Sequence, residues 1–214
     1  MPRGLDHIVH AVRNLEAAAE RYRRLGFTVG ARNRHPWGTH NHIVQFPGFF
    51  IEILTVAEPE KLGDDGFSKM FGGFNRRFLE SYEGFSLLIL ESKDAVADER
   101  VFAGSKISAS PVMRFERDGR QPDGSSVKVA FSLAFGQDPL ATAIGFAVCE
   151  QHHPEHFWNE RFQEHANGVT RVAGAVMVAE NPSDHHIFLS ALTGERDLHS
   201  TSTGITVTTP RGEI

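Results

Sequence analysis

One carboxylate occupies an unusual place in this sequence, because Glu52 interrupts the strongly apolar run Phe49–Val56. Burying a carboxylate is costly unless it is paired, hydrogen-bonded or bound to a metal. Histidine is plentiful, with 12 residues, and its imidazole both binds metals and titrates near neutral pH. One of these histidines, His7, lies inside the alternating segment 5–11. Glu52 and His7 are therefore the first candidates for a functional site.

Other histidines form two groups with several open interpretations. His40 and His42 share one face of a predicted strand beside the loop that holds Trp37. They could line a pocket, act as a general acid or base, or lie at the edge of a sheet. Residues 152–153, with His156, resemble a metal-binding tract, but they follow a strand end, where a polar turn is the more common structure.

A strand followed by a capped helix would position the first candidates. Residues 5–12 alternate as a strand, Asn14 is a suitable helix N-cap, and Gly26 can end the helix in a left-handed conformation. Three further strands are predicted at residues 27–29, 42–46 and 49–56. The predicted order of this unit is βαβββ.

The same order is predicted again later in the chain. A strand at 85–90 precedes a helix that Ser92 can cap and Gly104 can end. Three more strands are predicted at residues 111–116, 125–135 and 141–150. A third unit begins with a strand at 169–179 and a helix capped by Asn181. It continues as strand material at 200–208 and 213–214, and it stops before its last strand is complete.

An aromatic segment separates the first two units. Phe67, Phe71, Phe74 and Phe78 recur at near-helical spacing within residues 67–82. This spacing predicts a helix that packs on the core through its aromatic face. The same helix could also cover a pocket.

The three predicted helices have nearly equal lengths, and each follows one apolar strand and precedes another. Internal repetition of one supersecondary unit indicates that units pair to share a core. We therefore predict an α+β fold built from repeated βαβββ modules. The expected division is a paired domain at residues 1–165 and a third, incomplete module at 166–214.

The composition excludes several classes of protein. The 214 residues carry a formal net charge of −5, which gives no basic surface for nucleic acid. The single cysteine, Cys149, excludes disulfides within the chain and makes a thiolate zinc site implausible. No apolar run approaches the roughly 20 residues of a membrane helix, and the chain enters its first strand directly. We expect a cytoplasmic protein with no nucleic-acid or membrane partner.

The segment Leu5-Asp6-His7-Ile8-Val9 before a capped helix, with Phe50-Ile51-Glu52-Ile53-Leu54 at the end of the same unit, resembles the vicinal oxygen chelate superfamily. The resemblance is closest to its glyoxalase-like domain proteins. It implies that two modules pair and that their strands curve into a mixed-sheet cup that holds a divalent metal. It also implies that His7 and Glu52 are ligands, since family ligands come from the first and last strands of each module.

The second module departs from the family pattern. Matching the predicted helix caps places Ser86 opposite His7, so the second histidine of glyoxalase I is missing. Glu150 is the expected match for Glu52 and the third ligand, with Gln151 as the alternative if the register slips by one residue. His152 shares a face with Glu150. In the third module Gly174 stands opposite His7, so we expect no metal there.

These residues lead to two functional hypotheses. The first is a metal-dependent lyase, isomerase or dioxygenase in which His7, Glu52 and Glu150 hold Zn, Fe, Mn, Co or Ni, and a small molecule with vicinal oxygens chelates the ion. Glu52 and His42 would be catalytic. The remaining candidate positions would line the substrate pocket: Trp37, His40, Phe50 and His152.

The alternative is a metal-free protein that binds or sequesters a small molecule in an aromatic-lined cup. In that case Glu52 should pair with a cation such as Arg114. Under both hypotheses the third module is an unpaired half with an exposed apolar face. It should dock on the first pair or on another subunit, so a homodimer is one expected assembly.

Overall fold

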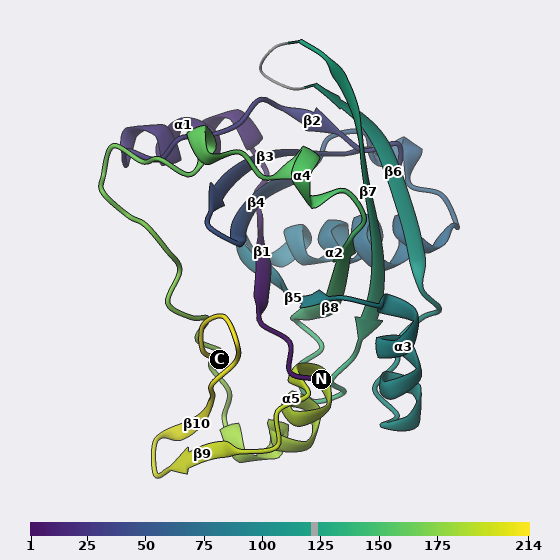
Figure 1. Ribbon diagram of the computed structural model, residues 1–214. Helices are drawn as coiled ribbons and strands as arrows, with labels where there is room; N and C mark the ends of the chain where they lie inside the picture. The colour runs from purple at the N-terminus through teal and green to yellow at the C-terminus, as the bar shows by residue number, and fades with distance from the viewer. Residues whose placement is uncertain (121–123) are drawn as a thin grey trace.

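The fold is built around one long, strongly curled mixed sheet, as the computed structural model shows for residues 1–120 and 124–214 (Figure 1). Eight strands follow one another in the order β2-β3-β4-β1-β5-β8-β7-β6. Their bounds are β1 Leu5–Ala11, β2 Asn33–Arg34, β3 Thr39–Phe46, β4 Phe49–Val56, β5 Gly84–Ser92, β6 Met113–Arg120, β7 Ser126–Gly136 and β8 Gly145–Gln151. The predicted α+β class is confirmed.

Two βαβββ modules meet at the centre of this sheet. In the first module β1 pairs parallel with β4, and in the second β5 pairs parallel with β8. The antiparallel pair β1 and β5 joins the modules. The helices α1 (Leu15–Arg24) and α3 (Ala95–Gly104) follow the first strand of each module. The predicted duplication is therefore present as a single continuous sheet.

The N-cap of α3 is Asp94, so the expectation that Ser92 caps this helix is wrong. The Asp94 side chain accepts a hydrogen bond from Ala97 N at 2.9 Å, while the Ser92 hydroxyl accepts one from Asp94 N at 3.1 Å. Both residue types are good caps, and the sequence does not distinguish them. The difference of two residues changes which positions of the two modules correspond.

The aromatic segment between the modules is helical but not uniform. A π-helix at Ser68–Gly73 leads directly into α2 (Phe74–Ser81), and a short 3₁₀ turn at Pro59–Lys61 precedes them. Asn75 is fully buried at the junction, where its amide donates to Phe71 O at 2.9 Å. A π-helical turn widens the backbone locally and is common near functional sites.

The last part of the chain packs on the convex side of the sheet. It contains a 3₁₀ turn at Pro182–His185, α5 (His186–Thr193) and a separate hairpin of β9 (Leu198–Thr201) and β10 (Gly204–Val207). Residues 169–179 form no strand, contrary to the prediction, apart from one bridge between Gly174 and Glu213. Residues 27–29 also form no strand. The turn expected between β6 and β7 includes residues 121–123, which lie outside the described residues.

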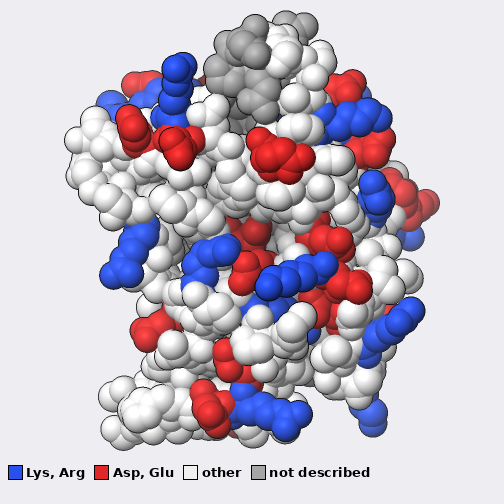
Figure 2. All heavy atoms as spheres, viewed as in Figure 1, with Lys and Arg blue, Asp and Glu red and all other residues white. Residues whose placement is uncertain are grey.

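The hydrophobic core is divided by the sheet. One cluster lies on the convex side, where Phe46, Phe102, Phe146 and Phe188 pack between the sheet and its helices. The other cluster lies inside the curl and is richly aromatic. Charged side chains of both signs are interspersed on the face shown in Figure 2. Among the described residues, no helix is long and apolar enough to cross a membrane.

Candidate functional site

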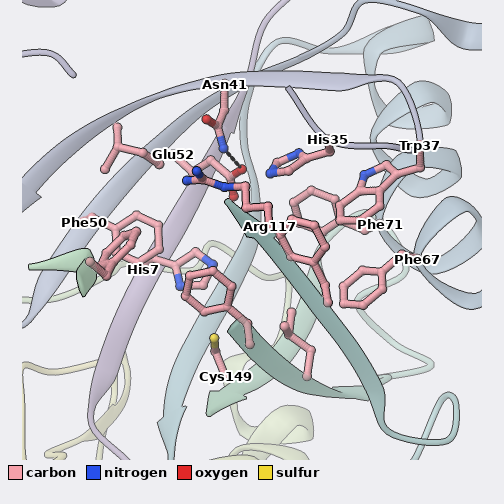
Figure 3. Close-up of a pocket in the computed structure, with 15 residues that line it drawn as sticks. His7, His35, Trp37, Asn41, Phe50, Glu52, Phe67, Phe71, Arg117 and Cys149 are labelled. Carbon is pink, nitrogen blue, oxygen red and sulfur yellow. Dashed lines mark hydrogen bonds between the residues drawn. The ribbon is translucent and has the colours of Figure 1, made fainter. Parts of the chain in front are cut away.

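The concave side of the curled sheet holds a pocket whose lining comes from both modules (Figure 3). The cavity measures about 70 Å³, enough for several waters or a small organic group. Its lining is His7, His35, Trp37, Asn41, Ile43, Phe50, Glu52, Phe67, Phe71, Phe115, Arg117, Phe131, Leu133, Cys149 and Phe157. Most of these residues are apolar or aromatic, and a few polar groups converge among them.

Glu52 is the buried carboxylate of this pocket. It lies in the middle of β4 and is only 5% exposed. The Asn41 amide on β3 donates a hydrogen bond to Glu52 Oε1, and Asn33 in turn donates to Asn41 Oδ1 at 2.9 Å. Burial raises the pKa of Glu52, while nearby His7, the Asn41 hydrogen bond and Arg117 act in the opposite direction. The net shift is upward, which favours a protonated carboxyl more than in water.

Arg117 supplies positive charge to the same pocket from the opposite side of the cup. It lies on β6 in the second module, and its guanidinium reaches towards Glu52 (Figure 3). Burial lowers the pKa of Arg117, and the charge of Glu52 raises it in compensation. The cation expected beside Glu52 in a metal-free cup is therefore Arg117 and not Arg114.

His7 enters the pocket from β1 with a fixed ring orientation. Its Nδ1 lies 2.5 Å from Asp6 Oδ1, and its ring stacks on Phe50 with centroids 4.2 Å apart and planes inclined by 12°. Asp6 also accepts from Gln151 Nε2 at 3.0 Å. With the Asp6 carboxylate as acceptor, Nδ1 carries the proton and Nε2 is the nitrogen left for a partner.

Stacked rings form the wall around these polar groups. Trp37 lies between His35 and Phe67, with ring centroids 4.7 Å and 4.8 Å away and nearly parallel planes, and Phe115 meets it edge-on. The pKa of His35 is lowered to about 3, chiefly by burial and also by electrostatic interaction with Arg117 and His40. His35 is therefore a neutral member of the wall.

Two predicted site residues on β3 lie outside the pocket lining. His40 Nε2 lies 3.0 Å from Glu58 Oε2. His42 Nδ1 lies 2.7 Å from Gly30 O, and its Nε2 lies 3.3 Å from a carboxylate oxygen of Glu16 on α1. The structure therefore places His42 on the side of the sheet that faces α1, away from Glu52.

The predicted residues at the end of β8 also lie elsewhere. Glu150 Oε2 accepts a hydrogen bond from Ala95 N at 3.0 Å, at the start of α3. His152 Nε2 lies 2.7 Å from Ser132 Oγ. Side chains alternate along a strand, so Cys149 faces the pocket while Glu150 faces α3. Of the predicted site residues, the structure brings together His7, Trp37, Phe50 and Glu52.

Strand register identifies which residues of the second module correspond to His7 and Glu52. His7 pairs with Ile89 and Val9 pairs with Leu87, so a two-fold relation between the modules exchanges positions 7 and 87. The two helix caps, Asn14 and Asp94, have the same offset of 80 residues. The match to Ser86 is therefore wrong by one residue, and the corresponding residue is Leu87.

The same relation applies to the last strands of the modules. Val9 pairs with Glu52 in the first module, and Ile89 pairs with Ala147 in the second. Ala147, and not Glu150, therefore corresponds to Glu52. The second half of the cup has two apolar side chains at the positions where the first half has an imidazole and a carboxylate.

Asn41, Arg117 and Cys149 line the pocket although the sequence did not predict them there. Arg117 had a detectable signal, because Met113, Phe115 and Arg117 alternate along β6 and must share one face. Its contact with the first module depends on the curl of the sheet, which a one-dimensional pattern does not show.

A family model described as a glyoxalase-like domain matches residues 5–193. The chain belongs to this family. A comparison with curated proteins gives no match.

Solved structures support the same fold. A hypothetical protein from Staphylococcus aureus is 17% identical, with 94% of this chain and 79% of that chain covered and a TM-score of 0.70. Methylmalonyl-CoA epimerase from Mycobacterium tuberculosis is 18% identical, with coverage of 69% and 87% and a TM-score of 0.47. At 17% identity, the similarity to the Staphylococcus aureus protein shows the fold alone.

The resemblance seen in the sequence implied a divalent metal in this cup, which would require a suitable set of donor atoms. Zinc and similar ions need three or four protein donors close together. Glu52 and His7 are two such donors, but Leu87 and Ala147 offer none, and Glu52 already meets Asn41 and the charge of Arg117. The donor set of the cup does not fit a metal held by both modules.

Proposed function

We propose that this glyoxalase-like protein binds a small planar organic molecule in its aromatic pocket without a metal, and that Glu52 exchanges a proton with it. The observation that carries the proposal is the surroundings of Glu52. It is a nearly fully buried carboxylate with a raised pKa, and it faces a cavity walled by stacked rings. A buried carboxyl group whose pKa is raised above its ordinary value is suited to general acid–base chemistry.

The neighbouring groups have complementary roles in this proposal. Asn41 holds one oxygen of Glu52, so the other oxygen is the one that can reach a bound molecule. His7, oriented by Asp6, offers Nε2 as a second hydrogen-bonding group. The Arg117 guanidinium can stabilise negative charge that develops when Glu52 removes a proton. The aromatic wall, including Phe50, would contact a planar molecule, while both faces of Trp37 are already covered by His35 and Phe67.

The volume of the pocket and the charge of the protein limit which kinds of molecule can bind. A cavity of about 70 Å³ suits a small molecule or one group of a larger molecule. The interspersed surface charges of Figure 2 and the net charge of −5 favour such a partner over nucleic acid. The proposed ligand is an aromatic or enolisable carbonyl compound, because Glu52 needs an acidic C–H, N–H or O–H group close to it.

The proposal can be tested without knowing the natural substrate. Small aromatic and α-hydroxycarbonyl compounds are screened by ligand-observed NMR, and bound compounds are incubated with the protein in D₂O. Exchange of an acidic C–H for deuterium should be detected in the wild type and lost in Glu52→Gln, which keeps the shape of the side chain. Glu150→Gln is the matched control, because this carboxylate faces α3 on the other side of the sheet.

The outcomes separate the parts of the proposal. Binding and exchange that persist in Glu52→Gln would overturn the role of Glu52. Binding without exchange in the wild type would mean that the protein binds or sequesters the compound without exchanging a proton with it. The absence of any bound compound across the screen would count against this pocket as a small-molecule site.

A metal-dependent lyase, isomerase or dioxygenase is the second candidate. One observation favours it: His7 and Glu52 enter the same pocket from neighbouring strands β1 and β4. The test is the metal content of untagged protein purified without chelator, with His7→Ala for comparison. Close to one equivalent of Zn, Fe, Mn, Co or Ni, lost in His7→Ala, would support this candidate over the metal-free one.

A further inference from the structure

A second group of potential ligands lies outside the pocket, on α4 (Pro154–Phe157) and the residue before it. His153, Glu155 and His156 each offer one ligand atom, and the three atoms lie within 4.8 Å of one another. Among the described residues, no other group of three or more His, Cys, Asp or Glu side chains meets this condition. The three side chains are partly or largely exposed, so an ion can reach them from solvent.

The spacing of these atoms is close to that of a metal site. His153 Nδ1 lies 3.7 Å and His156 Nε2 lies 3.8 Å from the same carboxylate oxygen, Glu155 Oε1. In a tetrahedral zinc site with bonds of about 2.0–2.2 Å, neighbouring donor atoms are roughly 3.3–3.5 Å apart. A contraction of a few tenths of an ångström would therefore bring each imidazole nitrogen to that distance from Glu155 Oε1, and all three ligand atoms already lie within 4.8 Å of one another. Rotation of exposed side chains can supply that movement.

The tautomer of His156 is already suitable for a metal. Its Nδ1 lies 2.7 Å from Lys128 O on β7, an acceptor that requires a proton on Nδ1. The lone pair is then on Nε2, the nitrogen that faces Glu155. Metal-binding histidines usually have such a partner on the other ring nitrogen, which fixes the ring orientation. The His153 ring lies against the His156 ring with centroids 5.3 Å apart.

The cluster is directly connected to the wall of the pocket. Phe157 is the last residue of α4 and lines the cavity, where its ring lies 4.9 Å from that of Phe50 and 5.7 Å from that of Phe131. Its carbonyl accepts a hydrogen bond from Gln45 Nε2 at 2.8 Å. The short helix therefore crosses from β3 to β7 at the open side of the cup (Figure 1).

We propose that His153, Glu155 and His156 form a surface site for a transition-metal ion of the Zn²⁺ type, with water in the fourth position. Two imidazoles and a carboxylate suit Zn²⁺, Co²⁺ or Ni²⁺ better than the hard ions Mg²⁺ or Ca²⁺. The bound ion joins both ends of a single helical turn to one carboxylate. It therefore fixes α4 and, through Phe157, one wall of the pocket. The binding part of this inference is independent of the function proposed for Glu52.

The site is tested on the untagged full chain by calorimetry with Zn²⁺ and by titration with Co²⁺. We expect one Zn²⁺ per chain, a visible Co²⁺ absorption band typical of four-coordinate geometry, and a change in the fluorescence of Trp158, which follows Phe157 directly. His156→Ala and His153→Ala should each weaken Zn²⁺ binding at least tenfold. His199→Ala removes an exposed histidine on β9 and should leave binding unchanged.

Further variants distinguish this site from the cup. His7→Ala should leave Zn²⁺ binding at α4 intact, so loss of binding in His7→Ala but not in His156→Ala would overturn the proposal. Glu155→Gln should weaken Zn²⁺ binding while the melting temperature in EDTA stays that of the wild type, since Glu155 is exposed. Absence of one-to-one binding at 100 μM Zn²⁺ would also overturn it. If Zn²⁺ binds but the Trp158 signal does not change, the link to the pocket wall is wrong.

Discussion

At the level of single residues, the two modules contribute different groups at corresponding positions of the pocket. His7 and Glu52 in the first module correspond to Leu87 and Ala147 in the second. A symmetric cup could close around an ion with donors from both halves, whereas this cup places a cationic side chain, Arg117, opposite the carboxylate. The two halves therefore contribute different chemical groups to the same pocket.

The burial of His35 predicts a specific acid sensitivity. Its pKa is about 3 in the folded protein and 6.5 in the unfolded chain, so between these values the unfolded state binds more protons. Stability is therefore fully present above pH 6.5 and falls as the pH decreases towards 3. From pH 7 to pH 5 this residue should reduce the free energy of unfolding by about 2 kcal/mol.

Urea unfolding at both pH values measures this effect. In His35→Phe the loss between pH 7 and pH 5 should be smaller than in the wild type by about that 2 kcal/mol. His199→Phe removes an exposed imidazole and is the control, for which the wild-type loss is expected. An equal loss in His35→Phe and the wild type would show that His35 titrates normally in the folded protein.

Pocket residues could be predicted where the signal lies within their own segment of sequence. They could not be predicted where the contact depends on the three-dimensional curl of the sheet. Glu52 could be identified from the sequence because it is a charged residue inside an apolar strand, where burying an unpaired charge is costly. Arg117 lies 65 positions later, and only the curl of the sheet brings it near Glu52. Glu150 was assigned to the wrong face because it lies three residues from Ala147, the true counterpart of Glu52, and a shift by an odd number of residues reverses the face of a strand.

At the level of elements, the N-caps of α1 and α3, Asn14 and Asp94, occupy corresponding positions in the two modules. Asp94 accepts a hydrogen bond from Ala97 N at 2.9 Å, so Asp94→Ala leaves this donor unpaired. The expected loss in the free energy of unfolding is about 1 kcal/mol, the usual value for a helix N-cap. Lys93→Ala, in the same turn, is the control. An unchanged urea midpoint in Asp94→Ala would show that Asp94 does not stabilise α3.

The junction between the π-helix and α2 depends on one buried amide. Asn75 donates to Phe71 O at 2.9 Å and accepts from Ser86 Oγ on β5 at 2.7 Å. In Asn75→Ala, Phe71 O keeps its bond from Phe74 N, whereas the Ser86 hydroxyl keeps only a long contact of 3.5 Å to Val9 O. A buried polar group that loses its partner costs about 1–3 kcal/mol. We expect a clear fall in urea stability, together with weaker ligand binding, because Phe71 is part of the pocket wall.

A double-mutant cycle tests this junction directly. Ser86→Ala should cost less stability in the Asn75→Ala background than in the wild type, because its partner is already missing. If the two losses simply add, the Asn75–Ser86 hydrogen bond does not hold α2 to β5. The π-helical turn itself was not predictable, since the aromatic spacing of residues 67–82 fits an α-helix equally well.

At the level of the whole molecule, the sequence predicted the two paired modules better than the C-terminal part. Periodic strands and similar helix lengths were enough to predict a duplicated βαβββ fold. Residues 169–179 have the composition of a strand, but the structure gives them one bridge, at Gly174, instead of a neighbouring strand. Strand composition is local, whereas strand formation requires a partner at the correct distance.

The C-terminal part shares its core with the modules, and this predicts how the protein unfolds. Phe188 on α5 packs edge-on against Phe146 on β8, with centroids 4.7 Å apart.

Two arginines also connect the C-terminal part to the modules. Arg3 donates to Leu192 O at 2.8 Å. The guanidinium of Arg211 donates to Leu5 O at 3.1 Å, to Gly48 O at 2.6 Å and to Glu91 Oε2 at 2.9 Å. Residues 166–214 should therefore unfold together with residues 1–165, in a single transition.

Phe188→Ala tests this coupling against a control from the same helix. Removing a buried phenylalanine typically costs about 3–5 kcal/mol, and here the loss should appear in the single transition of the whole chain. Ile187→Ala, whose side chain is 66% exposed, should leave the melting temperature nearly unchanged. Differential scanning calorimetry that resolves two transitions, with only the smaller one shifted by Phe188→Ala, would mean that residues 166–214 form a separate unit. A single shifted transition would mean that packing of α5 stabilises the same sheet that carries Glu52 and His7.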